Sequence, residues 1–112
     1  MRIHLLSGSN LKAADVNGKS DPYVIIKHQK QKVKSKVCNA TLNPNFFQHF
    51  SLDVEDMTKP LKFKVWDHDA VGSDDKLGKG SIDLNTLTSG SRYTIPLDTQ
   101  GSLLVQLDFT PH

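Results

Sequence analysis

Short segments of alternating apolar and polar residues run along most of the chain, and almost none repeats at helical spacing. The clearest segment is 61–66, where Leu61, Phe63 and Val65 alternate with two lysines and a tryptophan. Such alternation indicates a strand with one buried face and one exposed face. The pattern predicts eight short strands, over residues 1–6, 23–27, 31–37, 46–54, 61–66, 80–84, 92–97 and 103–109.

Turn-forming residue pairs separate the predicted strands. These pairs include Asn17-Gly18, Asn43-Pro44, Lys59-Pro60 and Gly72-Ser73. Regularly spaced short strands with turn signals between them are typical of a β-sandwich or a β-barrel. A chain of 112 residues has the size of one domain, and no internal repeat or linker divides it. We therefore expect a single all-β domain over residues 1–112.

The sequence shows no sign of a membrane span or of secretion. The longest apolar runs are a few residues long, whereas a spanning helix needs roughly 18. Residues 1–10 lack the apolar core of a signal peptide. Cys38 is the single cysteine, so no intrachain disulfide can form, which suits a reducing compartment. We expect a cytoplasmic protein that would meet a membrane from the side and reversibly.

The acidic residues are unusual in kind. Eleven of the 12 are aspartates, and Glu55 is the only glutamate. Aspartate is a turn and ligand residue that forms helices and strands poorly, so this bias points to functional loops. The aspartates concentrate in two segments between predicted strands, 14–22 and 66–75. In a sandwich, connecting loops gather at the two ends, so five or six carboxylates would converge if both segments lie at one end.

Converging carboxylates repel one another unless a cation lies between them. Calcium accepts six to eight oxygen ligands with loose geometry, whereas magnesium needs a stricter octahedron and zinc favours Cys and His. The plain alternative is that each aspartate only stabilises a turn. That alternative suits Asp21, which precedes a proline, better than it suits the trio Asp67, Asp69 and Asp75. An EF-hand is rejected, because Val71 and Gly78 occupy positions that such a loop fills with oxygen ligands.

Three motifs make the sequence resemble the calcium-binding C2 domains of protein kinase C and synaptotagmin. Residues 11–24 resemble the first calcium loop of that family and the strand after it. Residues 41–46 resemble its Asn-Pro-x-aromatic segment, and residues 65–69 with 74–78 resemble its third loop. After that aromatic residue, many members of the family have Asn-Glu, whereas this chain has Phe47-Gln48. The segment has a structural role in the family, so this difference puts no calcium ligand in doubt. The resemblance covers essentially the whole chain and implies an eight-stranded antiparallel Greek-key sandwich with calcium loops at one end.

The resemblance also implies a ligand set. The family holds calcium with five aspartate side chains and loop carbonyls, and every matching position here carries an aspartate. The matching side chains are Asp15, Asp21, Asp67, Asp69 and Asp75, the matching carbonyls are those of Ala14 and His68, and Asp74 adds an extra or outer ligand. We expect two calcium ions, with a third as the alternative. The chain begins at the strand before the first loop and ends with 103–109, which resembles the permuted type II topology.

Calcium in these loops would turn a surface that repels anionic lipid into one that binds it. We expect anionic phospholipids such as phosphatidylserine as partners, with Val16 and Val71 at exposed loop tips for shallow insertion. The lysines of 31–37 alternate onto one strand face, and family members use a matching surface for phosphoinositides. The corresponding positions are Tyr23, Lys27, Lys34, Lys36 and Trp66. The alternative is a solvated strand face whose lysines prevent aggregation.

Other functions are weighed against calcium-dependent membrane docking. A calcium-independent protein-interaction or phosphoinositide-binding module is the first alternative, and the complete aspartate set argues against it. Catalysis is not expected of this domain, because nucleophile elbow, P-loop and zinc-hydrolase motifs are absent, although it can belong to a larger enzyme. Nucleic-acid binding is not expected, because aromatic residues do not alternate with the lysines. We expect a monomeric, peripheral domain that moves from the cytoplasm to a membrane surface when calcium binds.

Overall fold

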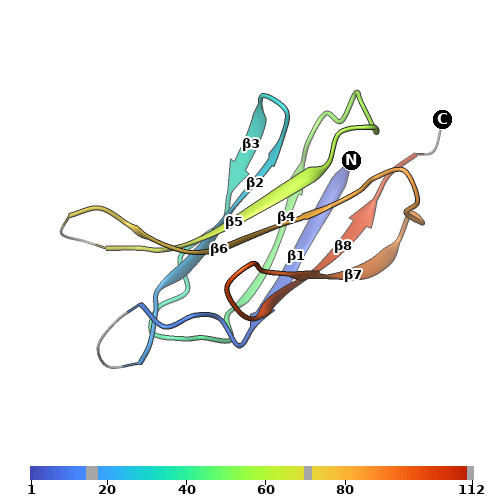
Figure 1. The fold of residues 1–112 in the computed structure, drawn as a ribbon. Coiled ribbons are helices and arrows are strands. Elements are labelled where there is room, and N and C mark those ends of the chain that lie inside the picture. Colours follow the sequence, from blue (N-terminus) through green and yellow to red (C-terminus); the bar gives the residue numbers. More distant parts are fainter. Residues whose placement is uncertain (15–17, 70–71, 111–112) are drawn as a thin grey trace.

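The computed structural model describes residues 1–14, 18–69 and 72–110 and forms a sandwich of two four-stranded antiparallel sheets (Figure 1). Its strands are β1 (Arg2–Ser9), β2 (Pro22–His28), β3 (Gln31–Lys34), β4 (Asn45–Ser51), β5 (Leu61–Asp67), β6 (Asp75–Ile82), β7 (Ser91–Pro96) and β8 (Ser102–Asp108). The predicted all-β sandwich is thereby confirmed. No helix in the described ranges is long and apolar enough to cross a membrane.

The strand order shows how the chain winds between the two sheets. One sheet has the order β4-β1-β8-β7 and the other β3-β2-β5-β6. The last strand, β8, lies between β1 and β7, so the end of the chain completes the sheet in which it began. This arrangement agrees with the expected permuted topology, in which the extra strand comes last.

The core lies between the sheets and consists of one face of each. Val24 and Ile26 of β2 and Phe63 and Val65 of β5 are fully buried. The other sheet contributes fully buried aliphatic side chains from β1 and β8: Ile3, Leu5, Leu103, Val105 and Leu107. Strand alternation therefore sends the residues between these positions outward, and the outward residues of β2 and β5 include Lys27, Lys62 and Lys64.

Both aspartate-bearing loops lie at the same end of the sandwich. Pro22, the first residue of β2, pairs with Asp67, the last residue of β5. The end of the loop before β2 and the start of the loop after β5 therefore lie next to each other. Figure 1 shows the described parts of both loops on the side of the sandwich away from the two termini.

Strand β6 begins at Asp75, earlier than the predicted start at residue 80. Glycines within this segment weaken its strand signal in the sequence. Gly80 is needed here, because a Cβ atom on it would lie 2.5 Å from the Pro96 carbonyl oxygen and 2.8 Å from Ile95 Cγ2. Close approach between β6 and β7, which belong to different sheets, thus explains the glycine.

Phe46 and Phe47 have opposite environments although they are neighbours on β4. Phe46 is fully buried, whereas Phe47 is 71% exposed and adopts a left-handed backbone with φ of 45°. The pairing of β4 with β1 shifts register at this point, as expected for a β-bulge. The next residue, Gln48, accepts a hydrogen bond from the Lys36 backbone N–H at 2.6 Å and ties β4 to the chain after β3.

Replacing Phe47 with asparagine is expected to stabilise the domain. A left-handed conformation costs an ordinary L-residue about 1–2 kcal/mol, and asparagine tolerates it better. We expect the free energy of unfolding in urea to rise by up to about 1 kcal/mol for Phe47→Asn. Phe46→Ala is the contrasting variant and is expected to lower it by about 3–5 kcal/mol. Equal destabilisation by both substitutions would contradict this assignment of the two phenylalanines.

Candidate functional site

Direct hydrogen bonds join the two aspartate-bearing loops. The Asp21 backbone N–H donates to Asp67 Oδ1 at 2.7 Å, and the His68 N–H donates to the Asp21 carbonyl at 2.9 Å. Asp67 is only 3% exposed, so its carboxylate lies within this junction. The Asp21 side chain accepts a third bond, from the Ala40 N–H at 2.7 Å. Backbone donors therefore orient both carboxylates before any ligand binds.

Asp75 brings a further carboxylate to the same place. It is the first residue of β6 and pairs with Asp67 across the β5–β6 ladder. Directly opposed like charges on neighbouring strands destabilise a sheet, because their side chains lie within a few ångströms of each other. Asp21, Asp67 and Asp75 therefore occupy adjacent positions on β5, β6 and the entry to β2, which confirms that the two loop segments meet.

The third loop is organised by Asp74. Its Oδ1 accepts the Asp69 backbone N–H at 2.9 Å and lies 3.8 Å from His68 Nδ1. Its Oδ2 accepts a hydrogen bond from the Tyr23 hydroxyl on β2. The Tyr23 ring also meets His68 edge-on, with ring centroids 6.4 Å apart. Both oxygens of the Asp74 carboxylate thus hold parts of the loop and the adjacent sheet.

The remaining predicted loop residues are placed unequally. Ala14 and His68 are exposed, as carbonyl ligands at a loop surface require. Asp15, Val16 and Val71 lie outside the described residues. Sequence analysis missed the fully buried Ser20, whose hydroxyl donates to the Lys12 carbonyl and accepts the Ala14 N–H, both at 3.0 Å. The sequence feature that could have identified Ser20 is its place as a small polar residue immediately before the Asp21-Pro22 turn.

The donor set fits a hard cation. Within the described residues, no three His, Cys, Asp or Glu side chains lie close enough together to hold a metal ion. Asp21, Asp67 and Asp75 are neighbours through the backbone pairing of β2, β5 and β6, and their carboxylates are not gathered around one point in the described part of the chain. Oxygen ligands from loops suit Ca²⁺, which tolerates irregular coordination, better than they suit zinc.

The outer face of the second sheet is strongly basic because of its register. Lys32 pairs with Lys27, Lys27 with Lys62, and Lys62 with Ser81, which gives one row across four strands. The next row runs from Lys34 through Ile25 and Lys64 to Lys79. Paired residues point to the same side of a sheet, so lysines from all four strands share this face.

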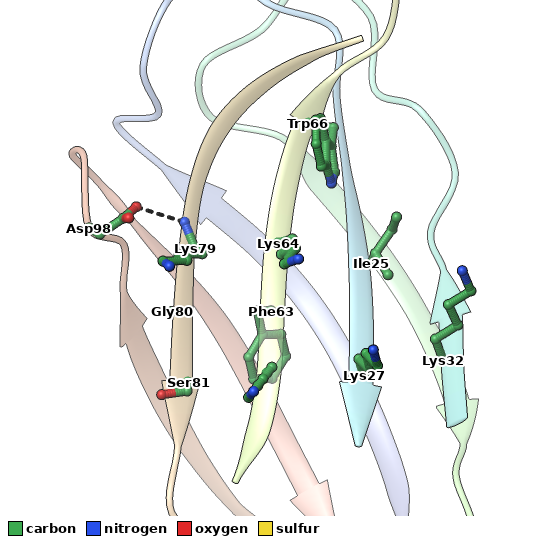
Figure 2. A pocket seen from close by; sticks show the side chains of 11 residues that line it. Ile25, Lys27, Lys32, Phe63, Lys64, Trp66, Lys79, Gly80, Ser81 and Asp98 are labelled. Carbon is green, nitrogen blue, oxygen red and sulfur yellow. Dashed lines mark hydrogen bonds between the residues drawn. The ribbon is translucent and has the colours of Figure 1, made fainter. Parts of the chain in front are cut away.

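A groove of about 610 Å³ runs across this face (Figure 2). The five basic residues that line it are Lys27, Lys32, Lys62, Lys64 and Lys79. Trp66 lies at one end, and its indole nitrogen is buried without a hydrogen-bond partner among the described residues. Figure 2 shows that nitrogen on the side facing Ile25 and Lys64. A buried N–H without a partner is costly, and because this nitrogen is shielded from solvent, the accessible feature of the groove is the positive charge of its lysines.

The predicted lipid-binding residues divide between the groove and its margin. Lys27 and Trp66 line the groove. Tyr23 is only 5% exposed, with Lys34 Nζ 4.5 Å from its ring centroid, and Lys36 lies beyond the end of β3. Sequence analysis missed Lys79, because its membership of this face depends on the pairing of β6 with β5.

The Tyr23 hydroxyl should lose its proton at unusually high pH. Burial, then the hydrogen bond to Asp74 and its charge, raise the pKa of Tyr23 to about 12. The folded protein thus binds this proton more tightly than the unfolded chain, and the resulting stability is present below pH 10 and lost as pH rises toward 12. We expect Asp74→Asn to lower the Tyr23 pKa in an ultraviolet absorbance titration, with Tyr23→Phe assigning the signal. An unchanged pKa in Asp74→Asn would contradict the contact.

Comparisons with known proteins agree with this architecture. A family model described as "C2 domain" matches residues 1–98. Tricalbin-3 of Saccharomyces cerevisiae is 37% identical over 115 residues, which cover 99% of this chain and 7% of that protein. A solved C2 domain of plant Extended Synaptotagmin 1 has a TM-score of 0.85 at 26% identity, covering 98% of this chain and 95% of that one.

A second solved structure, described as two C2 domains of Extended-Synaptotagmin 2 with calcium bound, has a TM-score of 0.74 at 30% identity. The match covers 93% of this chain and 42% of that structure. This chain thus corresponds to one module of longer relatives such as tricalbin-3. With a family model matching most of its residues and a sandwich of the same architecture, the chain belongs to the C2 domain family.

Proposed function

We propose that this domain binds anionic phospholipid membranes when calcium occupies its loops and thereby acts as a peripheral membrane-targeting module. The observation that carries the proposal is the adjacency of Asp21, Asp67 and Asp75 at one end of the sandwich. Such a junction repels anionic lipid as long as its charges are uncompensated. The calcium-bound state named for the related extended synaptotagmin supports the choice of ion.

The proposed ligand set comprises side chains and carbonyls from both loops. The side-chain ligands are Asp15, Asp21, Asp67, Asp69 and Asp75, and the carbonyl ligands are those of Ala14 and His68. Two ions, with a third as the alternative, would supply positive charge that offsets these carboxylates and accepts lipid oxygens. Asp74 belongs to the outer layer, because it orients the Asp69 backbone.

Docking follows from charge compensation and shallow insertion. Phosphatidylserine is the proposed headgroup, since its phosphate and carboxylate are hard oxygen donors that calcium accepts. Val16 and Val71 are the proposed tip residues, and shallow burial of a valine contributes up to roughly 1.5 kcal/mol. We propose a monomer that moves from the cytoplasm to the membrane surface as calcium rises, with catalysis, if any, in other parts of a longer protein.

The lysine-lined groove supports a second candidate function, calcium-independent binding of phosphoinositides or of an acidic protein surface. Five lysines from four strands line one groove. Each lysine near an anionic membrane contributes about 1 kcal/mol. Phosphoinositides suit the groove best, because they carry several phosphates on a compact headgroup and present them at a surface.

Removing one calcium-loop carboxylate should abolish calcium-dependent docking at moderate calcium concentrations. Asp67→Asn keeps the side-chain oxygen that accepts the Asp21 N–H but removes the charge. In co-sedimentation with phosphatidylserine vesicles, we expect the wild type to bind with calcium and to stay in solution with a chelator. We expect Asp67→Asn to need at least about tenfold more calcium, equivalent to about 1.4 kcal/mol.

Asp83→Asn is the matched control, because Asp83 is exposed and follows β6 at the opposite end of the sandwich. It should bind as the wild type does. No calcium-dependent binding of the wild type at any calcium concentration would overturn the proposed function, and a protein partner would become the leading candidate.

Removing lysines from the groove should weaken phosphoinositide binding with and without calcium. Lys62 and Lys64 lie on β5 in the middle of the basic face. We expect the double variant Lys62→Gln/Lys64→Gln to bind phosphoinositide-containing vesicles about 30-fold more weakly, from about 1 kcal/mol per lysine. Lys59→Gln, outside the groove, is the control. Unchanged affinity in the double variant would remove the groove from consideration.

A further inference from the structure

The turn between β7 and β8, residues 97–101, contacts chain segments next to both aspartate-bearing loops. We call it the β7–β8 turn, and a hydrogen bond from the Leu97 N–H to the Gly101 carbonyl closes it at 3.0 Å. Its residues bond to the chain that enters the first loop and also to β6, which follows the third loop. Because β7 and β8 belong to one sheet and β6 to the other, these contacts bridge the two layers of the sandwich.

Gln100 holds the chain at the entrance to the first loop. Its side-chain amide donates to the carbonyls of Asn10 and Leu11, each at 3.2 Å. The N–H groups of the same two residues donate to the chain before β4, to Asn43 Oδ1 at 2.9 Å and to the Leu42 carbonyl at 2.9 Å. All four backbone polar groups of this pair therefore have partners, and Gln100 supplies two of the four bonds.

Thr99 and Asp98 hold β6 just after the third loop. The Thr99 hydroxyl donates to the carbonyl of Leu77, which is fully buried and follows Asp75 by two residues. The Asp98 N–H donates to the Lys79 carbonyl at 2.9 Å, and Asp98 Oδ1 accepts the Lys79 N–H at 2.8 Å (Figure 2). Because β6 is the outermost strand of its sheet, the turn uses backbone groups on its open edge, and three bonds fix the strand that begins at Asp75.

The two limbs of the first loop are held in different ways. The returning limb is fixed to the third loop directly, by the bond from the Asp21 N–H to Asp67. The outgoing limb, residues 10–14, extends from β1, which belongs to the other sheet. Its position relative to β6 therefore depends on contacts that cross between the sheets. The β7–β8 turn supplies such contacts, because Gln100 holds the outgoing limb while Thr99 holds β6.

We propose that the β7–β8 turn positions the calcium site, with Gln100 fixing the outgoing limb of the first loop and Thr99 fixing β6 behind the third loop. The inference rests on the proposed function. Ligands from both loops, the Ala14 carbonyl and the Asp75 carboxylate among them, are then in place before calcium arrives. A site with its ligands in place binds more tightly, because less conformational freedom is lost on binding. Gln100 and Thr99 act through the backbone that they hold, so they are positioning residues.

The test is calorimetric titration with calcium of variants that remove a donor and keep the size of the side chain. Gln100→Met removes the amide, and Thr99→Val removes the hydroxyl. We expect each variant to bind calcium about fivefold more weakly than the wild type, which corresponds to the net worth of a typical hydrogen bond. Thr99→Ser restores the hydroxyl and is expected to bind calcium within about twofold of the wild type.

Matched controls make the same chemical changes within the strands that flank the turn. Gln106→Met lies on β8 and Thr94→Val on β7, where the two residues are on the outer face of the sheet. Both controls should keep the calcium affinity of the wild type.

A measurement without calcium separates positioning from a general loss of stability. The Ala14 N–H bonds to Ser20 Oγ at 3.0 Å within the outgoing limb, and the Val24 N–H bonds to Ser35 Oγ at 2.8 Å in the core. In Gln100→Met we expect amide hydrogen exchange at Ala14 to quicken about fivefold, with Val24 unchanged, because only the limb is released. A residue that merely stabilised the domain would quicken both amides alike.

The outcomes distinguish this inference from the proposed function. If the wild type gives no calcium isotherm, both are overturned. If the wild type binds calcium and both Gln100→Met and Thr99→Val bind it equally well, or if the two amides quicken alike, the inference is overturned while the calcium proposal stands. Weaker calcium binding by both variants, its recovery in Thr99→Ser and faster exchange at Ala14 without a change at Val24 would support the inference.

Discussion

The pairing of β2 with β5 is the contact on which both candidate sites depend. Its register places Pro22 opposite Asp67 and Lys27 opposite Lys62. One end of this ladder joins the acidic loops, and its outer side carries the lysines. A slip of one residue would send the lysines toward the core and Val24 and Val65 toward solvent, because side chains alternate with a period of two. The cost of burying lysines therefore disfavours a slip of one residue.

The same β2–β5 ladder carries carboxylates and lysines at separate places along its length. The acidic loop junction lies at the end of the strands, and the basic rows begin a short distance farther along β2 and β5. Tyr23 and Trp66, paired on the outer face, lie between the two regions. These aromatic residues separate carboxylates from most of the lysines. The modest net charge of +2 therefore conceals two strong local fields of opposite sign.

Local patterning predicted most of this architecture, and pairing between distant segments accounts for what it missed. All eight strands were expected, because alternation such as that of 61–66 is a local property. The predicted start of β6 was wrong, because glycines within the segment weaken its strand pattern, and Gly80 is required by a close approach to Pro96, which is distant in sequence. Lys79 was missed for the same reason, because its place beside Lys64 depends on strand pairing. The hydrogen bond from the Tyr23 hydroxyl to Asp74 joins residues 51 apart in sequence, so local sequence patterns could not predict it.

Two features of the folded domain cost stability, and both lie at the candidate sites. Asp67 faces Asp75 across a ladder, although opposed carboxylates repel each other. The Trp66 indole N–H is buried without a partner in the described residues, although such donors usually find one. A cation at the loop junction would remove the first cost, whereas the second is a cost of the fold itself, because the Trp66 nitrogen is shielded from solvent. A membrane surface that brings anionic headgroups together with calcium would relieve the repulsion between the carboxylates at the loop junction, while its headgroups would meet the lysines of the groove.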